Sequence, residues 1–112
     1  MSDNTSKTHS QTNPFFVSLI FSLSQSALIS LGKISNPLTK NIERNLEQVK
    51  INIDILEMLK EKMVNNLTGD EDRFLNGILA DLQLNYADEV EKEERNNTEK
   101  KDEQNQQEQK NQ

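Results

Sequence analysis

The side chains that could take part in catalysis or metal binding are few and widely separated. The chain of 112 residues has no Cys and a single His, which excludes disulfide scaffolds, structural zinc fingers and thiol catalysis. His9 lies in a polar segment without a neighbouring ligand, so we interpret it as a solvent-exposed side chain and expect no Ser–His or metal–His chemistry. Glycines occur only singly, at Gly32, Gly69 and Gly77, and therefore indicate no phosphate-binding loop.

The carboxylates are more numerous, but their spacing favours structural roles. The acidic run Asp70-Glu71-Asp72 lacks the ligand spacing of a calcium loop, and helix capping accounts for it. Asp54 stands between two isoleucines, where we expect either a surface position at the edge of a helix face or an interhelical hydrogen bond. We therefore predict a protein that is not an enzyme and has no catalytic residue, cofactor or metal.

Charge and apolar residues divide the chain into three parts. The net charge is −6, which argues against nucleic-acid binding, because contacts to phosphates require Lys and Arg. Segments with almost no apolar side chains cannot offset the entropy of ordering their backbone. We accordingly expect a disordered tail over residues 1–13, a three-helix domain over 14–87, and an acidic, Gln/Asn-rich tail over 88–112. This last tail is expected to be mostly disordered after a helical extension over 89–95, and to serve as a solubilising segment or an acidic docking arm.

The most hydrophobic part of the chain is a helix predicted over residues 15–31. Asn13 is a suitable N-cap and Pro14 suits the first helical position. Gly32 can adopt the left-handed conformation that ends many helices. No charged residue occurs between Lys7 and Lys33, so the whole helix is uncharged.

The two sides of this helix differ in composition. One side is a narrow strip of Ser and Gln side chains that is interrupted by Phe15, Leu19 and Ile29. Ser strips allow helices to approach closely, and we favour that role over binding of a polar ligand. With so narrow a polar side, the helix is expected to be buried nearly all round. The apolar side consists of Phe16, Ile20, Leu23, Ala27, Leu28 and Leu31.

Two amphipathic helices are predicted after it, and no stretch of the sequence indicates a strand. The second helix covers about 41–65, where apolar residues recur at spacings of three and four and an Asn pair at 65–66 offers a left-handed stop. The third begins at Thr68, which forms a capping box with Glu71. Because about three residues join these two helices, we expect an antiparallel hairpin, connected to the first helix by a turn around an Asn-Pro pair at 36–37. The predicted fold is all-α, with a hydrophobic N-terminal helix, a long antiparallel helical hairpin and disordered polar tails.

The first helix does not fit a membrane span or a signal peptide. Its length of about 26 Å falls short of a hydrocarbon core of about 30 Å. A signal peptide needs a basic amino-terminal region, and here Asp3 offsets Lys7. We therefore expect a cytoplasmic protein.

Residues spread over 15–86 match the pattern of a known family. They are Phe15, Leu19, Ile20, Ser22, Leu23, Ser26, Ala27, Leu28, Leu31, Gly32, Asn36, Pro37, Thr39, Asn45, Leu46, Glu47, Ile53, Asp54, Leu56, Met58, Leu59, Lys62, Asn66, Leu67, Thr68, Glu71, Leu75, Leu79, Asp81, Leu82 and Tyr86. On these residues the chain resembles a small bacterial family, domain of unknown function 1844. One departure is Lys40, where the family usually has Gly, which implies a slightly different turn. The resemblance implies a short cytosolic helical protein and brings no activity, cofactor or catalytic residue.

The size of the predicted core favours self-association. About 74 ordered residues form a core that barely offsets chain entropy, and two partner helices can cover only part of the first helix. We therefore predict a homo-oligomer, most simply a dimer, whose interface is formed by the apolar side of that helix. The alternatives are a peripheral membrane or apolar-ligand binding protein using the same helix, and a module that docks on another protein. The predicted interface consists of Phe16, Ile20, Leu23, Ala27, Leu28 and Leu31.

Overall fold

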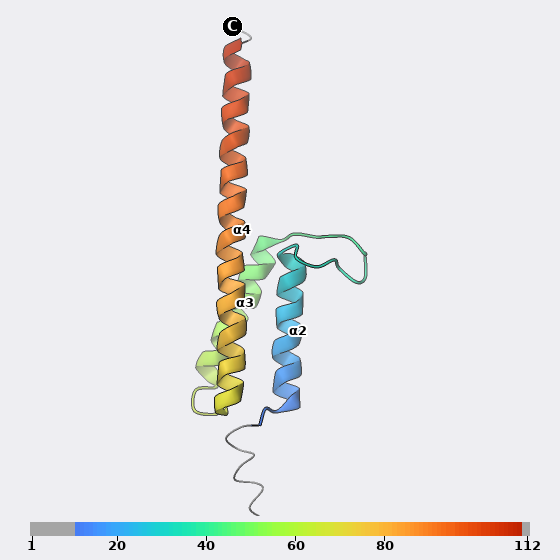
Figure 1. Ribbon diagram of the computed structural model, residues 1–112, viewed down its shortest axis with the longest axis vertical. Helices are drawn as coiled ribbons and strands as arrows, with labels where there is room; N and C mark the ends of the chain where they lie inside the picture. The colour runs from blue at the N-terminus through green and yellow to red at the C-terminus, as the bar shows by residue number, and fades with distance from the viewer. Residues whose placement is uncertain (1–10, 111–112) are drawn as a thin grey trace, which may run out of the picture.

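The computed structural model describes residues 11–110, which form three helices and no strand. The helices are α2 (Pro14–Ser30), α3 (Leu46–Lys62) and α4 (Gly69–Lys110). In Figure 1, α3 and α4 run antiparallel and α2 lies beside both of them. The all-α fold and the helical hairpin predicted from the sequence are confirmed.

Both ends of α2 are fixed by the residues that the sequence indicated. The Asn13 side chain accepts hydrogen bonds from the backbone N–H groups of the first turn, and Pro14 needs no such partner because it lacks an N–H. At the other end, Gly32 has a φ of 79°. The N–H of Lys33 then donates to the carbonyl of Leu28 over 3.0 Å, so the helix closes with a Schellman-type cap.

Helix α3 begins at Leu46 and not near residue 41, which corrects the predicted boundary. Asn45 caps the helix through its side chain, 3.2 Å from the N–H of Gln48. The backbone N–H of Asn45 donates to the carbonyl of Ser30 over 2.7 Å. This contact ties the preceding segment to the end of α2, and so keeps it out of a helix. The predicted left-handed stop after α3 is found at Asn65, whose φ is 67°.

Helix α4 continues well past the bundle. The capping box is present, because Thr68 and Glu71 exchange hydrogen bonds of 2.9 and 3.1 Å between backbone N–H and side-chain oxygen atoms. We expected a mostly disordered tail with a helical extension only over 89–95, but the helix runs to Lys110. Its later residues include many Glu, Lys and Gln, which have high helix propensity, and no Pro or Gly. This part projects beyond the other helices (Figure 1) and gives the molecule a long dimension of 84 Å.

A single apolar core lies where the three helices meet. Each large side chain that is fully removed from water contributes about 1.5–3 kcal/mol to the free energy of unfolding, before the entropy of ordering is subtracted. Helix α2 with its C-cap Leu31 contributes four buried apolar residues to this core, and α3 and α4 contribute three each. The buried apolar residues are Phe16, Ile20, Ala27, Leu31, Val49, Ile53, Leu56, Leu75, Leu79 and Leu82.

Candidate interaction surface

The apolar side of α2, which we predicted as an interface between copies, packs within the chain. Phe16, Ile20, Ala27 and Leu31 are buried in the core just described. Leu23 and Leu28 are partly buried and pack against it. These six residues hold α2 on the hairpin, and their surface is therefore not free for a partner while the chain is folded in this way.

The opposite side of α2 is exposed, contrary to the expectation of a helix buried nearly all round. Phe15 is 84% exposed, Leu19 is 48% exposed and Phe21 is 54% exposed. Small polar side chains lie between these apolar residues, and none of the residues in the helix is charged. We call this side the outer face. It comprises Phe15, Ser18, Leu19, Phe21, Ser22, Gln25, Ser26 and Ile29.

A groove runs along the carboxyl-terminal half of the outer face. It has a volume of about 550 Å³ and is bounded on its other side by the segment that precedes α3. Within that segment the Asn36 side-chain amide donates to a Glu43 carboxylate oxygen over 3.1 Å. The α2 side of the groove carries two large apolar side chains, Phe21 and Ile29, beside Ser22, Gln25, Ser26 and Ser30.

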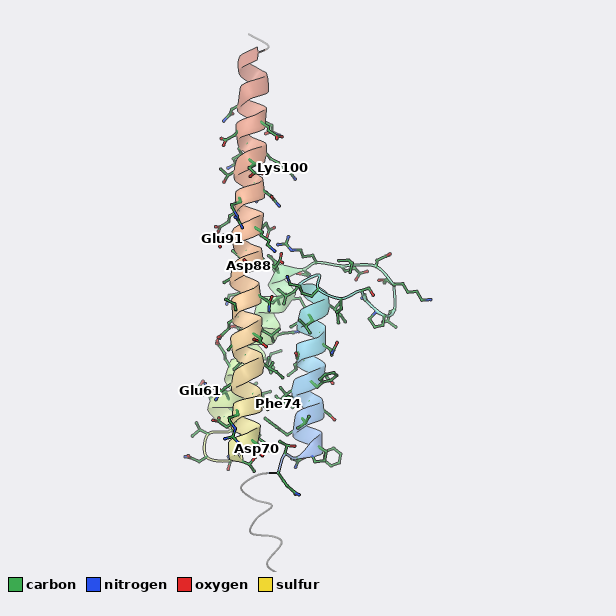
Figure 2. The ribbon with its side chains drawn as sticks, in the orientation of Figure 1. Glu61, Asp70, Phe74, Asp88, Glu91 and Lys100 are labelled. Atoms are coloured by element: carbon green, nitrogen blue, oxygen red, sulfur yellow. The ribbon has the colours of Figure 1, made fainter. Side chains whose placement is uncertain are left out.

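Glu89 of α4 holds the connection between α2 and α3 in place. Its carboxylate lies 3.0 Å from the Lys33 ammonium, 3.2 Å from the Arg44 guanidinium and 3.6 Å from the Lys92 ammonium. Arg44 also donates to the backbone carbonyl of Glu89 over 2.9 Å. The hydrogen bond from Lys33 is the main cause that lowers the pKa of Glu89. Asp88, its neighbour, is marked in Figure 2 at the level of this connection.

Sequence reasoning missed Glu89, because the domain was expected to end at residue 87. The residue lies among other acidic side chains, and the partners Lys33 and Arg44 are distant in the sequence. Only the packing of the connection against α4 distinguishes it from its neighbours.

Glu71 joins the amino-terminal ends of α2 and α4. One carboxylate oxygen accepts from the N–H of Thr68 over 2.9 Å, and the other accepts from the N–H of Asn13 over 2.8 Å. These two backbone hydrogen bonds, the one from Thr68 first, lower the pKa of Glu71, although burial acts in the opposite direction. The capping residue of α2 is therefore itself held by the capping box of α4.

The other acidic side chains of this run pair with neighbouring side chains of the same helix. Asp70 pairs with Arg73, and Asp72 accepts from the Asn76 amide over 3.3 Å. Within residues 11–110 no group of three metal-ligating side chains comes together. His9 lies outside the described residues.

A buried amide makes the interhelical hydrogen bond that we had considered for Asp54. Asp54 is exposed and pairs with Lys50 at 3.3 Å along the same helix. Asn52 is buried and donates to the carbonyl of Leu23 in α2 over 3.3 Å. Asn52 follows the buried Val49 by three residues and so lies on the apolar side of α3. This spacing is the signal that could have identified it.

The fold and its surfaces define a small three-helix domain with one exposed, uncharged helix face. Residues 13–88 match the model of a protein family, Domain of unknown function (DUF1844), and the chain belongs to this family. No curated protein and no solved structure matches the chain. Among the helices of the described residues, none is long and apolar enough to cross a membrane.

Proposed function

We propose that this protein is a non-enzymatic interaction module that forms a homodimer through the outer face of α2. The observation that carries the proposal is the exposure of Phe15, Leu19 and Phe21 on one uncharged helix. Single exposed apolar residues are common in soluble proteins, whereas several on one face mark an interaction surface.

The chemistry of the outer face favours a second copy as its partner. In a two-fold symmetric dimer the same surface meets itself, so each charge would face a like charge near the axis. The chain as a whole has a net charge of −6, so two copies repel each other overall. The outer face of α2 has no charged residue, and two copies can therefore meet there without electrostatic cost.

A membrane surface or an apolar ligand is the alternative occupant of this face. Helices that lie in a membrane interface usually carry Lys and Arg on their polar side, and α2 carries neither. Flotation with anionic lipid vesicles distinguishes the two proposals, because a dimer that buries the outer face stays in the lipid-free fraction. A cytoplasmic location, as expected from the sequence, is part of the same proposal.

The proposal is tested by placing a negative charge on the outer face. Phe15→Glu puts an acidic side chain in the first turn of α2, where it interacts favourably with the helix dipole and so should not unfold the chain. Leu84→Glu is the matched control, because Leu84 is 71% exposed on α4. We expect sedimentation velocity to show monomer for Phe15→Glu and dimer for Leu84→Glu. Equal dimerisation of both variants would overturn the proposal.

A further inference from the structure

Two pairs of residues on the outer face of α2 are matched in type about Ser22, whereas Leu19 and Gln25, three residues to either side, are not. Phe15 and Ile29 lie seven residues to either side, and Ser18 and Ser26 lie four residues to either side. Residues seven apart differ by only about 20° around a helix, so Phe15, Ser22 and Ile29 share one line on the surface. At 1.5 Å per residue, Phe15 and Ile29 are each about 10 Å from Ser22 along the axis.

We infer that two α2 helices pack antiparallel about a two-fold axis at Ser22, with Phe15 of each copy seated in the groove of the other. This inference rests on the proposed dimer and adds its direction, register and anchor. A two-fold axis at this point places Phe15 opposite Ile29 of the second copy. It also places Ser18 opposite Ser26, and Ser22 opposite itself.

The side chains that face one another in this register are complementary in size. Along the central line of the face the serines place only hydroxymethyl groups near the axis, with Leu19 and Gln25 to either side of that line. Small side chains on this line let helix axes approach to the lower end of the usual 8–10 Å range. Farther out, Phe15 is 84% exposed. An aromatic side chain that enters a pocket of the partner is the typical anchor of a protein interface.

The groove offers Phe15 apolar contacts. The groove has a volume of about 550 Å³ and lies along the carboxyl-terminal half of α2. In the antiparallel register this half faces the first turn of the partner's α2. Phe21 and Ile29 provide apolar contact, and aromatic rings such as those of Phe15 and Phe21 pair favourably edge to face. In a parallel dimer, Phe15 would lie beside its own copy and the groove would stay empty.

The interface is small, so the dimer should be reversible. One helix face with an adjoining groove falls at or below the low end of the range of about 1,200–2,000 Å² that stable complexes bury. We therefore expect the two-chain species to dissociate on dilution.

Single Cys substitutions test the register, because the chain has no Cys of its own. A disulfide needs Cα atoms within about 7 Å. Under mild oxidation we expect Ser22→Cys to shift from the one-chain to the two-chain band on a non-reducing gel. Ser18→Cys alone should stay in the one-chain band, because its two copies are about 12 Å apart along the axis. A mixture of Ser18→Cys and Ser26→Cys should cross-link, and Thr98→Cys on the projecting part of α4 reports random collisions.

The outcomes separate the register from the proposed function. If Ser18→Cys cross-links with itself as fully as Ser22→Cys, the helices are parallel; the register is then overturned while the dimer stands. If no variant cross-links faster than Thr98→Cys and the unmodified chain has the mass of a monomer, the proposed dimer itself is wrong.

Discussion

At the scale of single residues, two carboxylates connect segments that are far apart in the sequence. Glu71 accepts hydrogen bonds from the backbone at the start of both α2 and α4, and Glu89 pairs with two cations of the connection between α2 and α3. Hydrogen bonds to charged groups are stronger than those between neutral groups. Both residues therefore contribute to the position of α2, the helix that presents the proposed interface.

The lowered pKa of Glu71 predicts how stability depends on pH. Since the pKa is lower in the folded than in the unfolded state, the charged carboxylate stabilises the fold above its unfolded pKa, about 4.3. That contribution is lost as the pH falls through the folded pKa. We expect Glu71→Gln to lower the free energy of unfolding by about 1–2 kcal/mol at pH 7, because the amide keeps one acceptor oxygen of two.

Urea unfolding at pH 7 and at pH 3 measures the effect. The difference between Glu71→Gln and the unmodified chain should shrink at the lower pH. Glu61, an exposed carboxylate on α3 that is marked in Figure 2, provides the control variant Glu61→Gln, for which we expect almost no change. A loss for Glu71→Gln that is the same at both pH values would show that the charge is unimportant.

A second prediction at this scale concerns Lys40. Its φ is 61°, a left-handed conformation that disfavours any side chain with a Cβ atom and suits Gly. We expect Lys40→Gly to raise the free energy of unfolding by about 0.5–1 kcal/mol, as measured by urea unfolding. Leu38→Gly in the same connection, where φ is not positive, should lower it. If Lys40→Gly is also destabilising, the turn does not hold Lys40 in this conformation in solution.

At the scale of helices, α4 has a part that packs and a part that does not. Val90 is its last apolar residue, and Lys92 is the last residue of α4 that pairs with Glu89. Lys100 lies on the projecting part (Figure 2), whose described side chains beyond residue 95 are all exposed. An isolated helical segment of this length is marginal in water, so the projecting part depends on the packed part for its helical start.

This division predicts the effect of shortening the chain. A chain that ends at Arg95 should change its free energy of unfolding by less than about 0.5 kcal/mol, while its helical circular dichroism per molecule falls. A chain that ends at Ala87 loses Val90 and the partner of Lys33 and Arg44, and should be clearly less stable. Equal stability of the two shortened chains would contradict the role assigned to Glu89.

Local signals in the sequence predicted the helix ends that depend on one turn of chain. Asn13, Gly32 and the Thr68–Glu71 capping box act on backbone groups a few residues away, so their types and spacing were sufficient. The predicted start of α3 was wrong because Ile42 fits the apolar spacing of the helix and extends the apolar pattern. The hydrogen bond from Asn45 to Ser30, which keeps this segment out of the helix, joins two segments that only the fold brings together.

The candidate surface was harder to predict than the fold. Hydropathy identified the strongly apolar side of α2, and that side is the one the chain buries in its own core. The exposed apolar residues are those that interrupt the Ser strip, such as Phe15 and Leu19. A helix wheel shows both sides but does not state which one the hairpin covers, because the area that α3 and α4 can cover depends on how they pack.

At the scale of the whole molecule, α2 has a separate role for each side. Its inner side completes the core, and its outer face is the uncharged, partly apolar surface of a protein that is otherwise rich in charge. The projecting part of α4 lies at the opposite end of the molecule from the start of α2 (Figure 1). An antiparallel dimer would therefore carry its two α4 projections in opposite directions.

The most direct test of self-association is the molar mass of the unmodified full chain by light scattering over a wide range of concentration. Light scattering gives mass without assuming a compact shape, which matters for a molecule 84 Å long. The proposed dimer predicts a mass that rises with concentration from 12.9 kDa to twice that value. A mass that stays at 12.9 kDa at every concentration would contradict it.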